Sequence, residues 1–233
     1  MKKIMVLFFI MTSLAMGDYL DTWDELLQKY TSIGTKDGIN LVAVDYSRLK
    51  QDIKFEKLLE EVKEVEIKKL EGNELKAFWI NTYNIGAVKM IIDNYPIDGI
   101  KDAGTLFRPV WKKSIIEVGD KKYSLDEIEN EILRKTGDEL IHFAIVCASI
   151  SCPDLKMSAY RGRDLDKELL EQKLKFIEEK NKGIYREGDT IYISRIFKWY
   201  KGDFGNLREY LDISEDNKIK YLDYNWKLNG LNR

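Results

Sequence analysis

Apolar residues recur at the spacing of an amphipathic helix in several segments of the chain. The longest segment is followed by Tyr95 and Pro96, and a residue before proline avoids the helical region, so this helix should end there. Another segment begins at Ser124 and has Glu127 three residues later, which is the signature of a capping box. The pattern predicts helices at 21–30, 47–65, 71–94, 124–135 and 164–180, with short helices at 195–200 and 207–211.

Two β-hairpins are expected from turn signals between short apolar stretches. Gly119 and Asp120 divide the segment 114–123, and Gly188 divides the segment 183–194. Glycine at such a two-residue turn is typical of a hairpin.

Three further segments complete the expected fold. Residues 141–146 are apolar except for one position, as in an interior strand, and 222–228 alternate as in a half-buried strand. Residues 34–46 are expected to be irregular. We therefore predict an α+β fold with helices packed around a small, mostly antiparallel β-sheet.

The N-terminal residues have the pattern of a secretory signal peptide. Lys2 and Lys3 precede an apolar run that ends in Ala15, Met16 and Gly17. The run is shorter than the roughly 20 residues that span a bilayer, so no membrane span is expected after its removal. The prediction is a signal peptide at 1–17, a single α+β domain at 18–233, and a periplasmic or secreted location.

Charge and cysteine content narrow the function classes. Without Lys2 and Lys3, the 38 basic residues become 36, against 40 acidic residues, which gives a net charge of −4. This balance gives no reason to expect a nucleic acid partner. Two cysteines are too few for a disulfide-rich scaffold, and with one histidine they match no common zinc pattern, so neither a metal nor another cofactor is expected.

Residues 141–153 contain the single histidine and both cysteines of the chain. Cys147 ends the expected strand and has the character of an inert core residue. Cys152 lies in a polar loop directly before Pro153, which favours an extended, accessible thiol. His142 is the one imidazole that could activate it.

A nucleophilic thiol needs a base beside it and a third group that orients the base. Glu129 lies at the edge of the buried stripe of its helix, so Glu129, His142 and Cys152 supply these three types. Three alternatives remain open: an ion pair of Glu129 with Arg134, a core histidine, and a disulfide between Cys147 and Cys152.

Polar residues near this segment are candidate substrate contacts. Asn81 and Asn84 lie on the face of the longest helix that points into the protein interior. There they either bind the backbone of a neighbouring loop or line a pocket. Ser149 and Ser151 lie in the loop before Cys152, whose backbone N–H groups could bind an oxyanion.

Several separated motifs in this order resemble one known family, called domain of unknown function 547. The motifs are FWINTYN at 78–84, NYP at 94–96, SLDEIENEILR at 124–134, IHFAIVCASISCP at 141–153, SRIFKWYKGDFG at 194–205 and YNWKLN at 224–229. The resemblance covers about 45–233.

The resemblance implies a fold similar to papain-like cysteine proteases, with a catalytic Glu, His and Cys at positions 129, 142 and 152. It also implies a connection to thiol compounds such as glutathione. The order Glu, His, Cys differs from that of papain, where cysteine comes first, and Asn130 stands where family members often have histidine.

The function expected from the residues and the resemblance is that of a secreted or periplasmic thiol-dependent hydrolase or transferase. Its substrate would be a small molecule or peptide with an acyl or thiol group. The alternative is a non-catalytic module that holds a peptide or small thiol in the same pocket.

Overall fold

A computed structural model describes residues 18–105 and 109–231. The predicted signal peptide lies outside the described residues. The helices are α1 (Tyr19–Tyr30), α2 (Tyr46–Leu49), α3 (Ile53–Lys63), α4 (Gly72–Asn94), α5 (Leu165–Glu178), α6 (Ile196–Trp199) and α7 (Leu207–Tyr210). Short 3-10 or π segments are η1 (Ile67–Lys69), η2 (Ile100–Ala103), η3 (Val110–Lys112), η4 (Glu127–Leu133), η5 (Arg134–Thr136), η6 (Glu139–Phe143) and η7 (Gly162–Asp164). None of the helices in this part of the chain has the length and apolarity that crossing a membrane requires.

The strands form three small sheets, so the predicted α+β class is confirmed, with the strands spread over three sheets. They are β1 (Thr31–Lys36) with β2 (Ile39–Val44), β3 (Ser114–Val118) with β4 (Lys121–Ser124), and β5 (Ile184–Glu187), β6 (Thr190–Ile193) and β7 (Lys218–Tyr221). All pairs are antiparallel except β6 with β7, which is parallel. The papain-like likeness and the single domain stay predictions.

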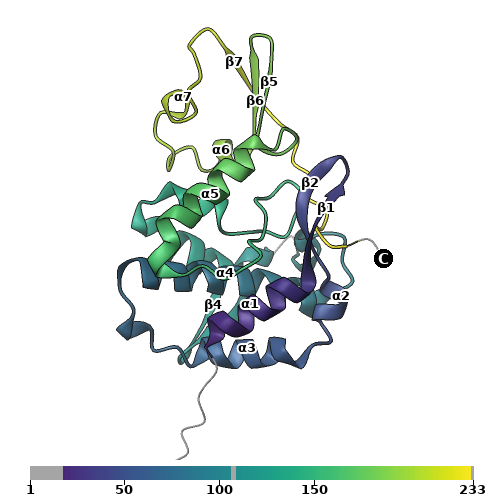
Figure 1. Ribbon diagram of the computed structural model, residues 1–233, viewed down its shortest axis with the longest axis vertical. Coiled ribbons are helices and arrows are strands. Elements are labelled where there is room, and N and C mark those ends of the chain that lie inside the picture. The colour runs from purple at the N-terminus through teal and green to yellow at the C-terminus, as the bar shows by residue number, and fades with distance from the viewer. Residues whose placement is uncertain (1–17, 106–108, 232–233) are drawn as a thin grey trace, which may run out of the picture.

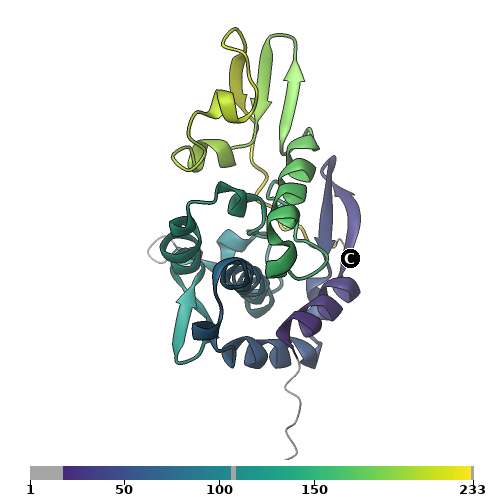
Figure 2. The ribbon, with the colours of Figure 1, turned by 60° about the vertical axis from the view of Figure 1, so that its left-hand side comes forward.

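Helix α4 is the centre of the fold and is buried on all sides along most of its length. Figure 2 shows it nearly end-on, surrounded by the other elements of the larger part of the molecule. Gly86 permits the close approach of the helical turn that leads into η4, because a Cβ there would lie 3.1 Å from the Leu125 side chain. Helix α4 ends at Asn94, as Tyr95–Pro96 predicts.

Besides the main apolar core around α4, a separate apolar cluster lies toward the C-terminal end of the chain. There β5, β6, β7 and α7 project from one end of the molecule (Figure 1). Phe143, Phe197 and Phe204 are the centre of this cluster, and their rings lie 5.0–6.0 Å apart. The candidate site lies near this cluster, because Phe143 directly follows His142 in η6.

The predicted hairpins at Gly119 and Gly188 are confirmed, and a third hairpin, β1–β2, was missed. Its turn residues Asp37 and Gly38 both have positive φ, 52° and 76°. Such an Asp-Gly pair is a strong hairpin signal, so the prediction that 34–46 is irregular is wrong. The predicted helix at 47–65 is divided into α2 and α3, because Asp52 caps α3 by accepting a hydrogen bond from Lys54 N–H.

The predicted strand at 141–146 is wrong, because η6 and an irregular segment occupy these residues. Asp138 starts the helical turn by accepting a hydrogen bond from the Leu140 N–H. A short apolar run fits a buried strand and a buried helical turn equally well. The predicted strand at 222–228 is also wrong, since these residues make only an isolated bridge from Leu228 to Ser149.

Two amides of α4 hold the neighbouring irregular segments by their backbones. Asn84 Nδ2 donates to the Ala144 carbonyl at 2.9 Å, and its Oδ1 accepts from Val146 N–H at 3.0 Å. Asn81 makes the same pair of bonds with Tyr160, at 2.8 and 2.9 Å. The irregular segment that leads to Cys147 is thus fixed to the most buried helix.

We expect Asn84→Ala to lower the free energy of unfolding by about 2–4 kcal/mol, because it leaves a buried N–H and a buried carbonyl without partners. Urea unfolding followed by circular dichroism measures this. The matched control is Asn73→Ala on the same helix, whose amide contacts only the exposed Asp166. An equal, small effect of both changes would contradict the anchoring role.

Candidate functional site

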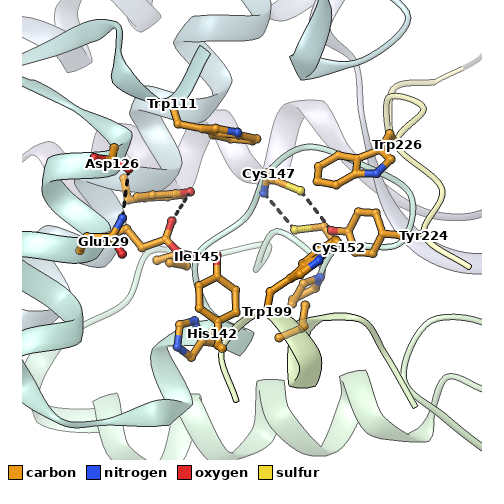
Figure 3. A pocket seen from close by; sticks show the side chains of 15 residues that line it. Trp111, Asp126, Glu129, His142, Ile145, Cys147, Cys152, Trp199, Tyr224 and Trp226 are labelled. Atoms are coloured by element: carbon orange, nitrogen blue, oxygen red, sulfur yellow. Dashed lines mark hydrogen bonds between the residues drawn. The ribbon is translucent and has the colours of Figure 1, made fainter. Parts of the chain in front are cut away.

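A cavity of about 300 Å³ lies where α4, the η4 segment, the cysteine loop, α6 and the C-terminal segment meet. Figure 3 shows Asp126 and Glu129 on one side, Cys147 and Cys152 toward the other, and His142 below them. The aromatic side chains of its wall are Tyr83, Trp111, Trp199, Tyr200, Tyr224 and Trp226. The cavity therefore combines carboxylates, thiols and an imidazole within a largely aromatic wall.

The two cysteines are free and lie side by side in this wall. Cys152 Sγ accepts a hydrogen bond from Cys147 N–H at 3.0 Å. Cys152 is only 5% exposed, whereas Cys147 is half-buried. The predicted assignment of Cys152 as the accessible thiol and Cys147 as core is therefore wrong, because the loop folds back and places Cys152 beneath Cys147.

Hydrogen bonds make Cys147 the more acidic thiol. Its Sγ lies 2.8 Å from Ser149 Oγ and 3.3 Å from the Tyr224 hydroxyl. Burial raises the pKa of Cys147, but the hydrogen bonds from the Cys152 thiol, Ser149 and Tyr224 outweigh burial and lower it to about 7. Burial and the neighbouring Cys147 raise the pKa of Cys152 well above the usual thiol value. The hydrogen bonds of Cys147 thus favour its thiolate over that of Cys152.

His142 pairs with Asp203, a residue that the sequence analysis did not identify. His142 Nε2 lies 2.7 Å from an Asp203 carboxylate oxygen, and the ring stacks on Tyr200 at a centroid distance of 3.9 Å. Burial lowers the pKa of His142 below 6.5, against the opposing effect of the Asp203 hydrogen bond. None of the hydrogen bonds among the described residues joins His142 to either thiol.

Asp203 is held ionised by Arg134. The guanidinium donates to both carboxylate oxygens, at 2.6 and 2.7 Å. This bidentate pair lowers the pKa of Asp203 to about 2. The alternative ion pair of Glu129 with Arg134 is therefore not formed, because Arg134 binds Asp203, which lies 69 positions away in the chain.

Glu129 lies in the cavity wall but does not orient His142, which corrects the predicted pairing. Its carboxylate accepts hydrogen bonds from the Tyr83 hydroxyl at 3.1 Å and the Tyr200 hydroxyl at 2.5 Å. Burial raises the pKa of Glu129, and the two tyrosine hydrogen bonds oppose this rise. Tyr200 therefore connects Glu129 with His142, because its hydroxyl donates to Glu129 and its ring stacks on the imidazole. The predicted Glu, His and Cys side chains share one cavity without forming a hydrogen-bonded triad.

The four predicted substrate contacts are buried outside the cavity wall. Asn81 and Asn84 bind loop backbones, which is the structural alternative of the sequence analysis. Ser149 bonds to Cys147 and Tyr224, and Ser151 Oγ accepts from Asn225 N–H. These residues thus support the cavity wall from behind.

Three of the four N–H groups of the loop 149–152, which were expected to bind an oxyanion, are already hydrogen-bonded. Ile150 N–H donates to the Lys227 carbonyl, Ser151 N–H to Asn225, and Cys152 N–H to Ser149. They are therefore not free to stabilise a tetrahedral intermediate. In the described part of the chain, no group of three or more His, Cys, Asp or Glu side chains is arranged to hold a metal ion.

Residues 67–177 match the model of a family described as "Protein of unknown function, DUF547". The match includes α4, η4 and the cysteine loop, while Asp203 and Tyr224 lie outside it. No curated protein and no solved structure matches the chain.

We expect the rate of alkylation by iodoacetamide to rise with pH as a single thiol phase with a midpoint near pH 7. The rate is measured as adduct formation by mass spectrometry over a pH series. Cys147→Ser should remove this phase. Tyr224→Phe should raise the midpoint, because a donor to the thiolate is lost. Tyr185→Phe is the control, and His142→Ala should leave the midpoint unchanged. A midpoint that rises on removal of His142 would contradict this account.

The single histidine permits an unambiguous titration by NMR. We expect His142 to titrate below pH 6.5 and Asp203→Asn to lower its pKa further, because the carboxylate stabilises the imidazolium. Since the folded pKa lies below that of the unfolded chain, this group's contribution to stability is present above pH 6.5 and is lost as the pH falls below it. Asp216→Asn, on the exposed surface, is the control. An increase in the His142 pKa in Asp203→Asn would refute the pairing.

Proposed function

The chain belongs, through residues 67–177, to the family described as "Protein of unknown function, DUF547", and we propose that it carries out thiol–disulfide exchange with a small disulfide-containing substrate. The observation that carries this proposal is the pair of free thiols in the cavity wall, where Cys147 Sγ lies within hydrogen-bond distance of Ser149 Oγ and the Tyr224 hydroxyl and Cys152 Sγ accepts from Cys147 N–H. These contacts lower the pKa of Cys147. A thiolate near neutral pH is the form that attacks disulfides and acyl groups.

Thiol–disulfide exchange fits the geometry better than acyl transfer. Acyl transfer needs donors placed for a developing oxyanion, and the N–H groups of Ile150, Ser151 and Cys152 are already used. It also needs a base at the thiol, whereas His142 pairs with Asp203. Exchange needs only a thiolate, a second thiol and access to the substrate sulfur.

The proposed reaction consumes a disulfide and two protein thiols. The Cys147 thiolate attacks one sulfur of the substrate disulfide, a Cys147–substrate disulfide forms, and the first substrate thiolate leaves and takes up a proton. Cys152 then loses its proton and attacks Cys147 Sγ, which releases the second substrate thiolate. The substrate gains two electrons, and the protein becomes a Cys147–Cys152 disulfide.

The order of attack follows from the coupling of the two thiols. The negative charge on Cys147 raises the pKa of Cys152, so Cys152 stays protonated at first. Once Cys147 is in a disulfide, this charge is gone, and Cys147 N–H still donates to Cys152 Sγ. The second thiol is thus activated only after the first has reacted.

Glutathione is a reasonable substrate to test first, given the thiol compounds that the family resemblance implies. We place the activity in the periplasm or outside the cell, on the strength of the signal-peptide pattern of residues 1–17. A non-catalytic module that holds a peptide or small thiol is the competing proposal.

The test is intact-mass analysis after reaction of the reduced protein with 2-hydroxyethyl disulfide or glutathione disulfide. Wild type should lose two hydrogen atoms as the internal disulfide forms. Cys152→Ser should accumulate a mixed disulfide on Cys147, and Cys147→Ser should form neither product at a comparable rate.

Absence of adduct in Cys152→Ser, with no oxidation of wild type, would refute the exchange reaction. Reversible binding of reduced glutathione by such an unreactive protein, measured by calorimetry, would instead support the binding module.

A further inference from the structure

The wall of the cavity opposite the thiols carries two acidic side chains. Asp126 and Glu129 line it, and none of the described lining residues is a lysine or arginine. The nearby cation Arg134 is bound by Asp203 and Asn130. Asp126 therefore faces the cavity without a basic side chain among the described lining residues, whereas both oxygens of Glu129 already accept hydrogen bonds from Tyr83 and Tyr200.

His142 adds an unused hydrogen-bond acceptor. Because Asp203 is ionised and can only accept, His142 Nε2 must carry the hydrogen. The neutral ring then has a lone pair on Nδ1, which is buried without a partner in the described structure, in a side chain that is 1% exposed. A buried acceptor of this kind calls for a donor, and His142 lines the cavity.

Aromatic faces complete the surroundings. Trp111, Trp199 and Tyr224 line the cavity, and such rings attract cations. Trp226 already has the Lys101 ammonium 3.3 Å from its ring centroid. Trp199 and Tyr224 lie on the thiol side and pack on Trp226 at centroid distances of 5.5 and 4.5 Å, which leaves Trp111 as the ring for a cation near the carboxylates (Figure 3).

We propose that the substrate carries an ammonium group a few bonds from its reacting sulfur. The ammonium donates to the carboxylates and to His142 Nδ1, while the sulfur meets Cys147 on the other side (Figure 3). A cavity of about 300 Å³ suits such a small compound. The sulfur part of this inference rests on the proposed function, and the ammonium part stands on the cavity alone.

Binding is tested with an unreactive pair of probes, hexane-1,6-diamine and hexane-1,6-diol. Tryptophan fluorescence reports on the cavity because three tryptophans line it. The diamine should bind roughly tenfold more tightly than the diol, and Asp126→Asn should remove most of this difference. Glu131→Gln, an exposed residue in the same η4 segment, should leave it unchanged. Equal binding of diamine and diol to wild type would overturn the proposal.

Reactivity is tested with cystamine and 2-hydroxyethyl disulfide, which match in length and differ in charge. The rate of each disulfide with the protein is divided by the rate of the same disulfide with dithiothreitol. This ratio corrects for the different intrinsic reactivity of the two leaving thiols. Wild type should favour cystamine roughly tenfold, and Asp126→Asn should reduce this preference.

The two proposals fail separately. If neither disulfide reacts but the diamine binds, the exchange function is wrong and the ammonium site stands. If both disulfides react equally and the diamine does not bind, the ammonium site is wrong and the exchange function stands.

Discussion

A buried, irregular segment of backbone must find hydrogen-bond partners away from the strands, and this constraint shapes the candidate site. Residues 144–152 contain no strand, yet they lie in the interior. Asn84 binds Ala144 and Val146, and the C-terminal segment binds Ala148, Ile150 and Ser151. The Cys147 N–H donates to a sulfur instead of a carbonyl. Backbone hydrogen bonding therefore places both thiols, and it also uses three of the four loop N–H groups that could serve an acyl-transfer site.

The two carboxyl groups near His142, those of Asp203 and Glu129, have different hydrogen-bond partners. Arg134 holds Asp203 as an anion at His142, while Tyr83 and Tyr200 bind Glu129. Tyr200 lies between these two systems, because it donates to Glu129 and stacks on the imidazole. A change at Glu129 can therefore reach His142 only through this ring, and the carboxylate remains directed at the cavity.

The sequence predicted the elements that have strong local signals. Helix α4, the Ser124–Glu127 capping box and two hairpins each depend on residues close together in the chain, and the structure contains all of them. The strand at 141–146 could not be distinguished from a helical turn, because every face is apolar. The pairing of His142 with Asp203 spans 61 residues, and no local pattern in the GDFG segment indicates it.

Burial shifts three ionisable groups of the cavity toward their neutral forms. It lowers the pKa of His142 and raises those of Glu129 and Cys152. The pKa of Cys147 is shifted the other way, because its hydrogen bonds with Cys152, Ser149 and Tyr224 outweigh burial. The same low-dielectric surroundings that suppress charge elsewhere strengthen these three hydrogen bonds. The fold thus directs the one readily formed negative charge of the cysteine loop to a single sulfur atom, and a cation bound at the carboxylates opposite would stabilise that thiolate further.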